Sequence, residues 1–220
     1  GLFGALGPEQ LQAMGLLGRN LDRLAVLVKD LLDAARLQSG RLGMARAPVA
    51  LHLVIEDVLQ SLGPRAREQG VALHGAGLSS SAVVVGDEGR LHQVLLNLMH
   101  NALKFTPGGG KVEVRLTEEG GDAVLEVSDS GLGLSQGQID RLFQPFMQVH
   151  DTTRHDVGGT GLGLYISRGI IDQHGGTLAC SSPGPGQGTA FTIRLPLMVF
   201  AEVPDGPAKR SAGKVGSAGR

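Results

Sequence analysis

The stretch 87–105 constrains the fold most, because it predicts a helix with two different faces. Apolar residues recur at intervals of three and four, as in a helix that packs on a sheet: Leu91, Val94, Leu95, Leu98 and Ala102. The other side carries Gln93, Asn97, Asn101 and Lys104. Asparagine costs a helix ~0.5 kcal/mol relative to alanine. This face is therefore either a surface with incidental amides or a row of oxygen ligands and one cation for a phosphate-bearing ligand.

Glycine is the second unusual feature, at 35 of 220 residues, and it clusters where loops are expected. An apolar strand ends in Asp129 and is followed by Gly131 and Gly133. A carboxylate at the end of a buried strand can accept a hydrogen bond from the exocyclic amine of adenine, whereas guanine presents an acceptor there. Glycines let the backbone approach a flat ligand. We therefore expect an adenine site at this loop.

Two further glycine clusters flank the last predicted helix, 162–174. The first lies just before or at the start of this helix, where backbone N–H groups and the helix dipole can hold phosphates: Gly158, Gly159, Gly161 and Gly163. The second, GPGQGT at 184–189, precedes the last expected strand. Together the glycines predict a nucleotide site built from loops.

Other glycine motifs fit less well. Neither GxGxxG nor GxxxxGK followed by Ser or Thr occurs in the strand–helix context that dinucleotide-binding and P-loop folds require. One GxSxG match, 133–137, follows a strand and could form the nucleophile elbow of a hydrolase. It overlaps the Asp129 loop, and the chain has no HGGG-like oxyanion segment. We therefore disfavour the hydrolase.

The expected elements indicate an α/β fold, an α+β sandwich in which helices pack on one face of a mixed, largely antiparallel sheet. The expected strands are 49–51, 71–73, 82–85, 111–117, 123–128, 177–181 and 189–195. The expected helices are 53–66, 87–105, 136–142 and 162–174.

The N-terminal region predicts a separate helix with a heptad seam. Its apolar positions follow spacings of 3 and 4 in alternation: Met14, Leu17, Leu21, Leu24, Val28, Leu31 and Ala35. A core helix of a single domain would also fit. Because the chain then continues into a Gly- and Arg-containing connector ending at Pro48, we favour a dimerisation helix.

Composition excludes several classes of protein. The net charge of -1 argues against a nucleic-acid-binding or membrane-surface protein. The lone cysteine, Cys180, excludes an internal disulfide and a cysteine-based zinc cluster. No apolar run approaches the ~18 residues of a membrane span, and no signal-peptide pattern is present. We expect a cytoplasmic location.

Five segments, in this order, resemble the catalytic and ATP-binding domain of bacterial sensor histidine kinases, members of the GHKL superfamily of ATPases and kinases. LHQVLLNLMHNALKFT resembles the N box, DSGLGL the first glycine box, LFQPFMQ the F box, GGTGLGL the second glycine box and GQGT the third. Residues 14–42 resemble the second helix of the dimerisation and phosphoacceptor hairpin. The resemblance implies a partial hairpin and linker over 1–47 and a catalytic domain over 48–197. We expect a disordered tail over 198–220.

The resemblance implies ATP and Mg²⁺ as ligands and assigns roles to individual residues. On the helix, Asn101 would ligate Mg²⁺, Asn97 would line the same face, and Lys104 would lie near the phosphates. Asp129 would recognise adenine, with Gly131, Gly133 and Thr189 around it. Phe143 and Phe146 would anchor a lid over 151–157. The triphosphate would be held by the loop that contains Gly159, Thr160, Gly161, Leu162 and Gly163.

One departure concerns the phosphoacceptor. None of the seven histidines is followed by an acidic residue and then Arg-x-Pro, as in the HELRTP-like motif of the family. The chain therefore resembles a kinase segment that begins inside the hairpin, or a product without its own acceptor. We expect it to bind ATP, to leave itself unlabelled, and to phosphorylate a supplied histidine for relay to a response regulator. The resemblance also implies a homodimer through the N-terminal helix.

Three alternatives remain. Gyrase, chaperone and mismatch-repair ATPases share the fold, but they use a Glu one turn before the Mg²⁺ Asn, where this chain has Asn97, which cannot act as a general base. A non-catalytic binding module is the second alternative. Anti-sigma-factor serine kinases are the third, and they lack the dimerisation helix that 14–35 would supply.

Overall fold

The computed structural model describes residues 7–78, 80–148 and 160–198, which form a sheet covered by helices and a long N-terminal helix. The five-stranded sheet has the order β2-β4-β5-β7-β6. Its strands are β2 (Ala72–Ala76), β4 (Lys111–Glu119), β5 (Asp122–Asp129), β6 (Thr177–Ser181) and β7 (Thr189–Pro196). Only β2 and β4 pair in parallel; the other neighbours are antiparallel. The predicted mixed, largely antiparallel sheet is confirmed.

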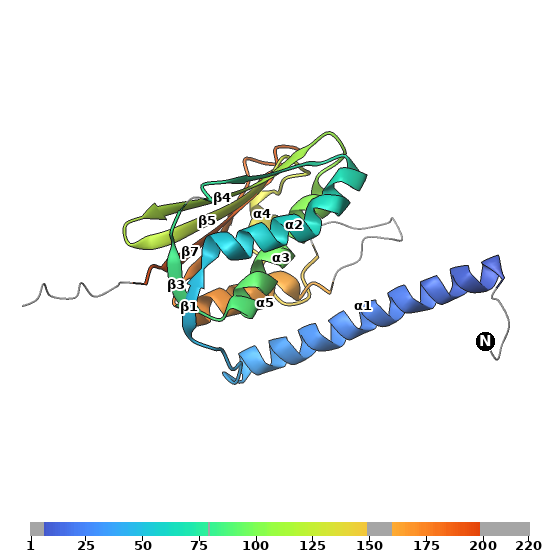
Figure 1. Cartoon of the computed structure of the whole chain (residues 1–220), viewed down its shortest axis with the longest axis horizontal. Helices are drawn as coiled ribbons and strands as arrows, with labels where there is room; N and C mark the ends of the chain where they lie inside the picture. Colours follow the sequence, from blue (N-terminus) through green and yellow to red (C-terminus); the bar gives the residue numbers. More distant parts are fainter. Residues whose placement is uncertain (1–6, 79, 149–159, 199–220) are drawn as a thin grey trace, which may run out of the picture.

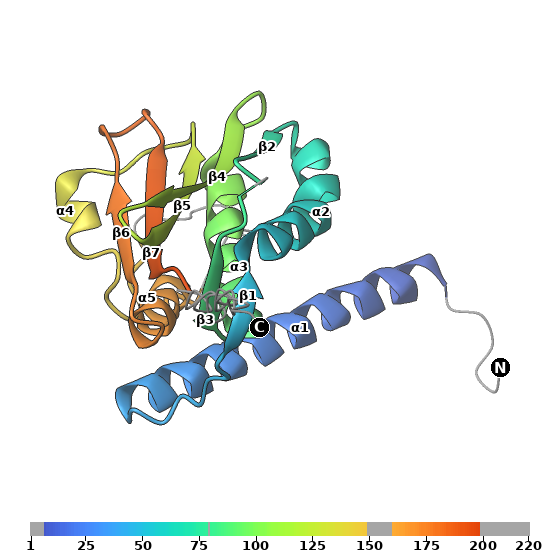
Figure 2. The ribbon, with the colours of Figure 1, turned by 60° about the vertical axis from the view of Figure 1, so that its left-hand side comes forward.

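Three helices cover one face of this sheet: α2 (Leu51–Gln69), α3 (Glu88–Phe105) and α5 (Gly163–Gln173) (Figures 1 and 2). The strands bury alternate side chains against them, as the period of two requires. In β4, for example, Val112, Val114 and Leu116 are buried whereas Glu113 and Arg115 form an exposed ion pair. The other face of β4 therefore stays polar.

Helix α3 has the two faces that its sequence predicts. Asp87 caps it, because a carboxylate oxygen accepts a hydrogen bond from Arg90 N–H at 3.0 Å. The predicted apolar stripe is buried, and two further residues join it. The buried set is Leu91, Val94, Leu95, Leu98, Met99, Ala102 and Leu103.

Two other helices differ from expectation in length. Helix α2 begins two residues before the expected start and runs past Pro64 to Gln69, because Gly70, with φ 68°, forms the left-handed cap that ends it. Helix α4 (Gln136–Ile139) is a single turn rather than the expected 136–142. Ser135 lies at its start, where its N–H donates to Gln138 Oε1 at 2.8 Å, so the GxSxG serine is a helix-start residue and no nucleophile elbow forms.

A second, small sheet joins the two ends of the folded unit. Strand β1 (Ala47–Ala50) pairs antiparallel with β3 (Val83–Gly86). Met198 N–H donates to Val83 C=O at 2.7 Å, so the end of the described chain returns to the same strand. The linker is fixed nearby, since Ala45 N–H donates to Asp87 Oδ2 at 3.0 Å. Of the expected tail, 198–220, Met198 is thus held against β3, and 199–220 lie outside the described residues.

Helix α1 (Pro8–Gln38) extends away from this unit, and only its C-terminal part lies against it (Figure 2). There Leu37 contacts Gly169 of α5 so closely that a methyl group at 169 would lie 2.7 Å from it. The predicted seam, in contrast, is more than half exposed from Met14 to Leu31. The seam therefore does not serve as core within the described chain. No described helix combines the length and apolar character that crossing a bilayer requires.

Candidate functional site

The amide face of α3 meets the start of α5. Asn97 Nδ2 donates to the buried Ser167 Oγ at 3.0 Å, which fixes the amide against α5. A Cβ at Gly163 would lie 2.5 Å from Asn97 Oδ1, so only glycine permits this approach. Asn97 is thus held at the N-terminal turn of α5, where the helix dipole favours anions. Sequence reasoning missed Ser167, since nothing in the sequence relates it to Asn97.

One and two turns further along α3 lie Asn101 and Lys104, both half-buried. Among the described residues, no hydrogen-bond partner holds the Asn101 amide, which leaves it available to a ligand. The Lys104 ammonium lies 4.8 Å from the centroid of the Phe105 ring. Burial lowers the pKa of Lys104, and a partly desolvated ammonium gains more from an anionic partner than an exposed one does.

Asp129 ends β5 beside the C-terminus of α3. Its Oδ1 accepts a hydrogen bond from Gly131 N–H at 2.8 Å, and the backbone of Thr189 on β7 supplies another. Burial raises the pKa of Asp129, and these two bonds offset part of that effect. The loop is joined to α3, because Leu132 N–H donates to Phe105 C=O at 3.2 Å. The structure therefore brings Asp129 and Thr189 together next to the helix end.

The first and third glycine segments pack backbone against backbone. Gly133 has φ 62°, and a Cβ there would lie 2.1 Å from Gly184 C=O. Gly186 N–H donates to Leu132 C=O at 2.6 Å, and Gly188 N–H donates to Gly131 C=O at 3.1 Å. Side chains at these positions would separate the two loops. The glycine content of both segments thus reflects one interface next to Asp129.

The F-box residues lie in different surroundings. Phe143 packs against the core, with the Arg168 guanidinium 5.3 Å from its ring centroid. Phe146 is 64% exposed and has φ 63°, a conformation uncommon for a side chain of its size. A Cβ at Gly161 would lie 2.6 Å from the Phe146 backbone, so the second glycine box contacts the F box. The expected lid, 151–157, and Gly159 lie outside the described residues.

The loop before α5 also contacts α1. Thr160 Oγ1 donates to Asp30 Oδ2 at 2.9 Å and accepts from Leu162 N–H at 3.1 Å. Burial raises the pKa of Asp30. Thr160, expected at the phosphates, therefore has an α1 carboxylate as its partner. No periodicity in the sequence pointed to Asp30.

A buried ion pair lies beside this contact. Asp33 of α1 accepts from Arg90 Nη1 at 2.8 Å and from Gln93 Nε2 at 3.3 Å, and its side chain is 4% exposed. Burial alone would raise the pKa of Asp33, but these two bonds and the nearby charges of Arg90 and Lys29 together outweigh it, so the pKa is lowered. Gln93, which the sequence placed on the amide face, thus faces α1.

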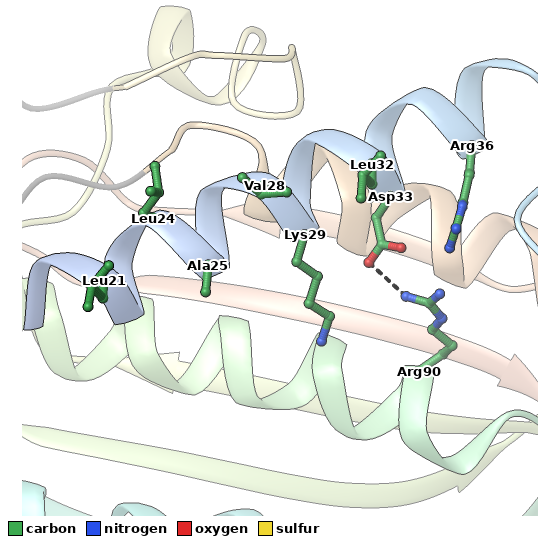
Figure 3. Close-up of a pocket in the computed structure, with 9 residues that line it drawn as sticks. All are labelled: Leu21, Leu24, Ala25, Val28, Lys29, Leu32, Asp33, Arg36 and Arg90. Atoms are coloured by element: carbon green, nitrogen blue, oxygen red, sulfur yellow. Dashed lines mark hydrogen bonds and ion pairs between the residues drawn. The ribbon is translucent and has the colours of Figure 1, made fainter. Parts of the chain in front are cut away.

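A groove runs along α1 next to this ion pair (Figure 3). Its volume is about 580 Å³, and leucines and valine line most of it, with the Asp33–Arg90 pair at one end. The lining residues are Leu21, Leu24, Ala25, Val28, Lys29, Leu32, Asp33, Arg36 and Arg90. None of them belongs to the Asp129 loop or to the Asn101 face. The groove is thus a second feature, separate from the candidate ligand site.

The stretch that contains the candidate ligand site matches a known protein family. Residues 86–199 match the family of histidine kinase-, DNA gyrase B- and HSP90-like ATPases, and the chain belongs to this family. This stretch contains α3, Asp129 and all three glycine segments.

Within the family, the chain is similar to sensor histidine kinases. It is 36% identical over 197 residues to sensor histidine kinase GacS of Pseudomonas protegens, covering 87% of this chain and 21% of that protein. It is 33% identical to the circadian input-output histidine kinase CikA of Synechococcus elongatus, covering 91% and 27%. The chain thus spans about a quarter of these relatives. The resemblance to sensor histidine kinases is confirmed.

Solved structures agree with the fold. Full-length ShkA in complex with AMPPNP superposes with a TM-score of 0.76 at 31% identity, over 90% of this chain and 41% of that one. Histidine kinase AdeS of Acinetobacter baumannii gives a TM-score of 0.70 at 25% identity, over 89% of each chain. The α/β fold class of histidine kinase catalytic domains is confirmed.

Proposed function

We propose that this chain binds ATP with Mg²⁺ and transfers the γ-phosphoryl group to a histidine. The observation that carries the proposal is the order of groups along α3. The half-buried Asp129 lies at the C-terminal end, followed by Lys104, Asn101 and then Asn97 at the start of α5. From Phe105 to Asn97 the helix spans about 12 Å. This order, from an acceptor for the base to groups suited to phosphates, matches a nucleotide laid along the helix.

Mg²⁺ would be held between Asn101 and the phosphates. Mg²⁺ takes oxygen ligands, keeps several waters and often uses few protein groups when phosphates are present. The described residues hold no cluster of three His, Cys, Asp or Glu side chains that could bind a metal alone. The amide oxygen of Asn101 fits a metal that arrives with its nucleotide. Bound there, it would neutralise charge on the phosphates during transfer.

Transfer is favoured over hydrolysis by the chemistry of position 97. A hydrolytic site needs a base that takes a proton from water, and the Asn97 amide cannot do so. Its Nδ2 is in addition engaged with Ser167 Oγ. We expect a slow steady-state ATPase rate, and a fast one would support the hydrolytic members of the family.

Nucleotide binding is tested by Asp129→Asn, measured by calorimetric titration with MgATP. We expect affinity to fall about tenfold or more, because a carboxylate that accepts a hydrogen bond is replaced by an amide with only one acceptor. Glu126→Gln on the opposite face of the same strand is the matched control and should bind as the parent does. Equal affinity of Asp129→Asn and the parent would refute the proposal.

Phosphoryl transfer needs a histidine supplied in trans. Two of the chain's own histidines have structural partners: His174 Nε2 accepts from Asp87 N–H at 3.0 Å, and His92 pairs with Asp57 at 2.9 Å. We expect labelled ATP to put acid-labile phosphate on a separate histidine-containing hairpin, and none on this chain alone. Acid-labile label on the chain alone would contradict this.

We also infer that two copies associate through α1. Its seam and the groove of about 580 Å³ expose leucines along most of the helix, a surface that favours association. Leu24→Glu should shift the chain towards monomer in light scattering coupled to gel filtration, whereas Leu53→Glu on the exposed side of α2 should not. A monomeric parent at micromolar concentration would refute the inference.

The final acceptor proposed is a response regulator in the cytoplasm. One structural neighbour is histidine kinase ThkA in complex with response regulator protein TrrA, at 24% identity. We expect phosphate from the labelled hairpin to pass to the aspartate of a receiver domain.

A further inference from the structure

Ser182 lies between β6 and β7, and its hydroxyl makes every hydrogen bond that a hydroxyl can make. It donates to Gly188 C=O at 2.6 Å. It accepts from Leu134 N–H at 3.0 Å and from Gly184 N–H at 3.3 Å. Gly184 C=O also lies 3.3 Å away, but the single hydroxyl hydrogen points to the nearer Gly188 oxygen.

These bonds join the two glycine segments on either side of Asp129. Leu134 belongs to the loop that follows Asp129, and its side chain is buried. Gly188 directly precedes Thr189, whose backbone donates to the Asp129 carboxylate. The hydroxyl therefore connects the segment that carries the carboxylate with the segment that orients it.

The packing between these segments leaves little freedom around this hydroxyl. A Cβ at Gly188 would lie 1.9 Å from Asp129 C=O, so the two backbones are already in contact. Without the hydroxyl, the Leu134 N–H would lose its partner in a buried setting, and the loops would have to separate or admit water. Either change would alter the direction in which Asp129 presents its oxygens.

We propose that Ser182 is a positioning residue for base recognition: it sets the spacing of the two glycine segments and so aims the Asp129 carboxylate at the 6-amino group of adenine. This inference rests on the proposed function, because it assumes that the base docks at Asp129. Within the described ranges, the Ser182 hydroxyl forms hydrogen bonds with backbone groups only. Its effect should therefore appear in the discrimination between bases more than in binding of the phosphates.

The test compares MgATP with inosine triphosphate, which carries an oxygen in place of the 6-amino group. The parent should favour ATP. Ser182→Ala should lower the ratio of the ATP affinity to the inosine triphosphate affinity about tenfold. The reason is that the Asp129 carboxylate is misaligned, while the residues that face the phosphates are unaffected. Ser182→Thr keeps the hydroxyl and should restore the ratio. Ser181→Ala, at an exposed neighbouring position, is the matched control and should leave it unchanged.

The outcomes separate this inference from the proposed function. A parent that does not distinguish the two nucleotides would overturn the docking at Asp129 itself. If the parent distinguishes them but Ser182→Ala has the same ratio of affinities for ATP and inosine triphosphate, only the role of Ser182 is overturned. The same holds if Ser182→Ala weakens the binding of both nucleotides equally. If Ser182→Ala does not fold, Ser182→Cys keeps the volume with a weak donor and should also lower the ratio; an unchanged ratio there refutes the role.

Discussion

The ion pair between Asp33 and Arg90 should contribute measurably to stability, unlike most ion pairs on protein surfaces. The Arg90 Nη1–Asp33 Oδ2 distance is 2.8 Å, and the Asp33 side chain is 4% exposed. A hydrogen bond to a charged group contributes about 1.5–3 kcal/mol. The Arg90 side chain is 19% exposed, so water can solvate its guanidinium once Asp33 is removed. The cost of breaking the pair should therefore stay below the ~3–5 kcal/mol of a fully buried pair. We expect a coupling free energy of about 2 kcal/mol.

A double-mutant cycle with Asp33→Ala and Arg90→Ala, followed by urea unfolding, measures this coupling. The exposed pair of Glu119 and Arg194 provides the matched control, since its N···O distance is 2.9 Å but its side chains are 55% and 45% exposed. There we expect about 0–1 kcal/mol. Equal coupling free energies for the two pairs would refute the argument that burial makes the difference.

The same ion pair gives stability a predictable pH dependence. The pKa of Asp33 is lowered in the folded state, so its contribution is present above the ordinary aspartate value of 3.8 and is lost as pH falls through the lowered folded-state pKa. Unfolding free energies of the parent should therefore approach those of Asp33→Ala in acid. If the difference in unfolding free energy between the parent and Asp33→Ala stays constant as the pH falls to the acid unfolding transition, the expected direction of this pH dependence is wrong.

Three further predictions concern the candidate site. The affinity for MgATP should fall as the pH drops through the raised pKa of Asp129. Asp129→Asn should lack this pH dependence. The same pH dependence in both proteins would show that another group titrates. Gly163→Ala should destabilise the fold by about 1–3 kcal/mol in thermal unfolding, because its Cβ would lie 2.5 Å from Asn97 Oδ1. Gly137→Ala is the control, because a Cβ there would meet open space, and it should not destabilise the fold. Equal melting temperatures for Gly163→Ala and Gly137→Ala would count against the close approach of Gly163 to Asn97. Burial, with the Asp129 charge, raises the pKa of Cys180 to about 12. Because only the thiolate reacts, alkylation at pH 8 should be roughly a thousandfold slower than in the unfolded chain, and it should be faster in Asp129→Asn than in the parent. Equal rates in the folded and the unfolded chain would contradict this.

The sequence was most informative where a single element determines the outcome. The period of the apolar residues in 87–105 is a local property, so it predicted both the buried and the amide face of α3. The glycine clusters marked the loops beside Asp129 because close backbone approach excludes a Cβ. The comparisons confirmed the fold class and the family, whereas the roles of individual site residues stay predictions.

Contacts between distant elements could not be predicted in the same way. Asp30 and Thr160 are separated by 130 residues, and nothing in either segment relates the two. Gln93 follows the period of the amide face, yet it bonds to Asp33 because α1 lies against that end of α3. The one-turn length of α4 and the extension of α2 past Pro64 likewise depend on their surroundings.

The small sheet of β1, β3 and Met198 has a consequence for a longer polypeptide. The connector reaches this unit beside Asp87, just past the C-terminal end of β3, whereas Met198 bonds to Val83 at the N-terminal end of the same strand. A domain attached after residue 198 and the connector to α1 would therefore be joined through the two ends of one four-residue strand. Force applied through either attachment would act on β3 and, through Asp87, on the first turn of α3.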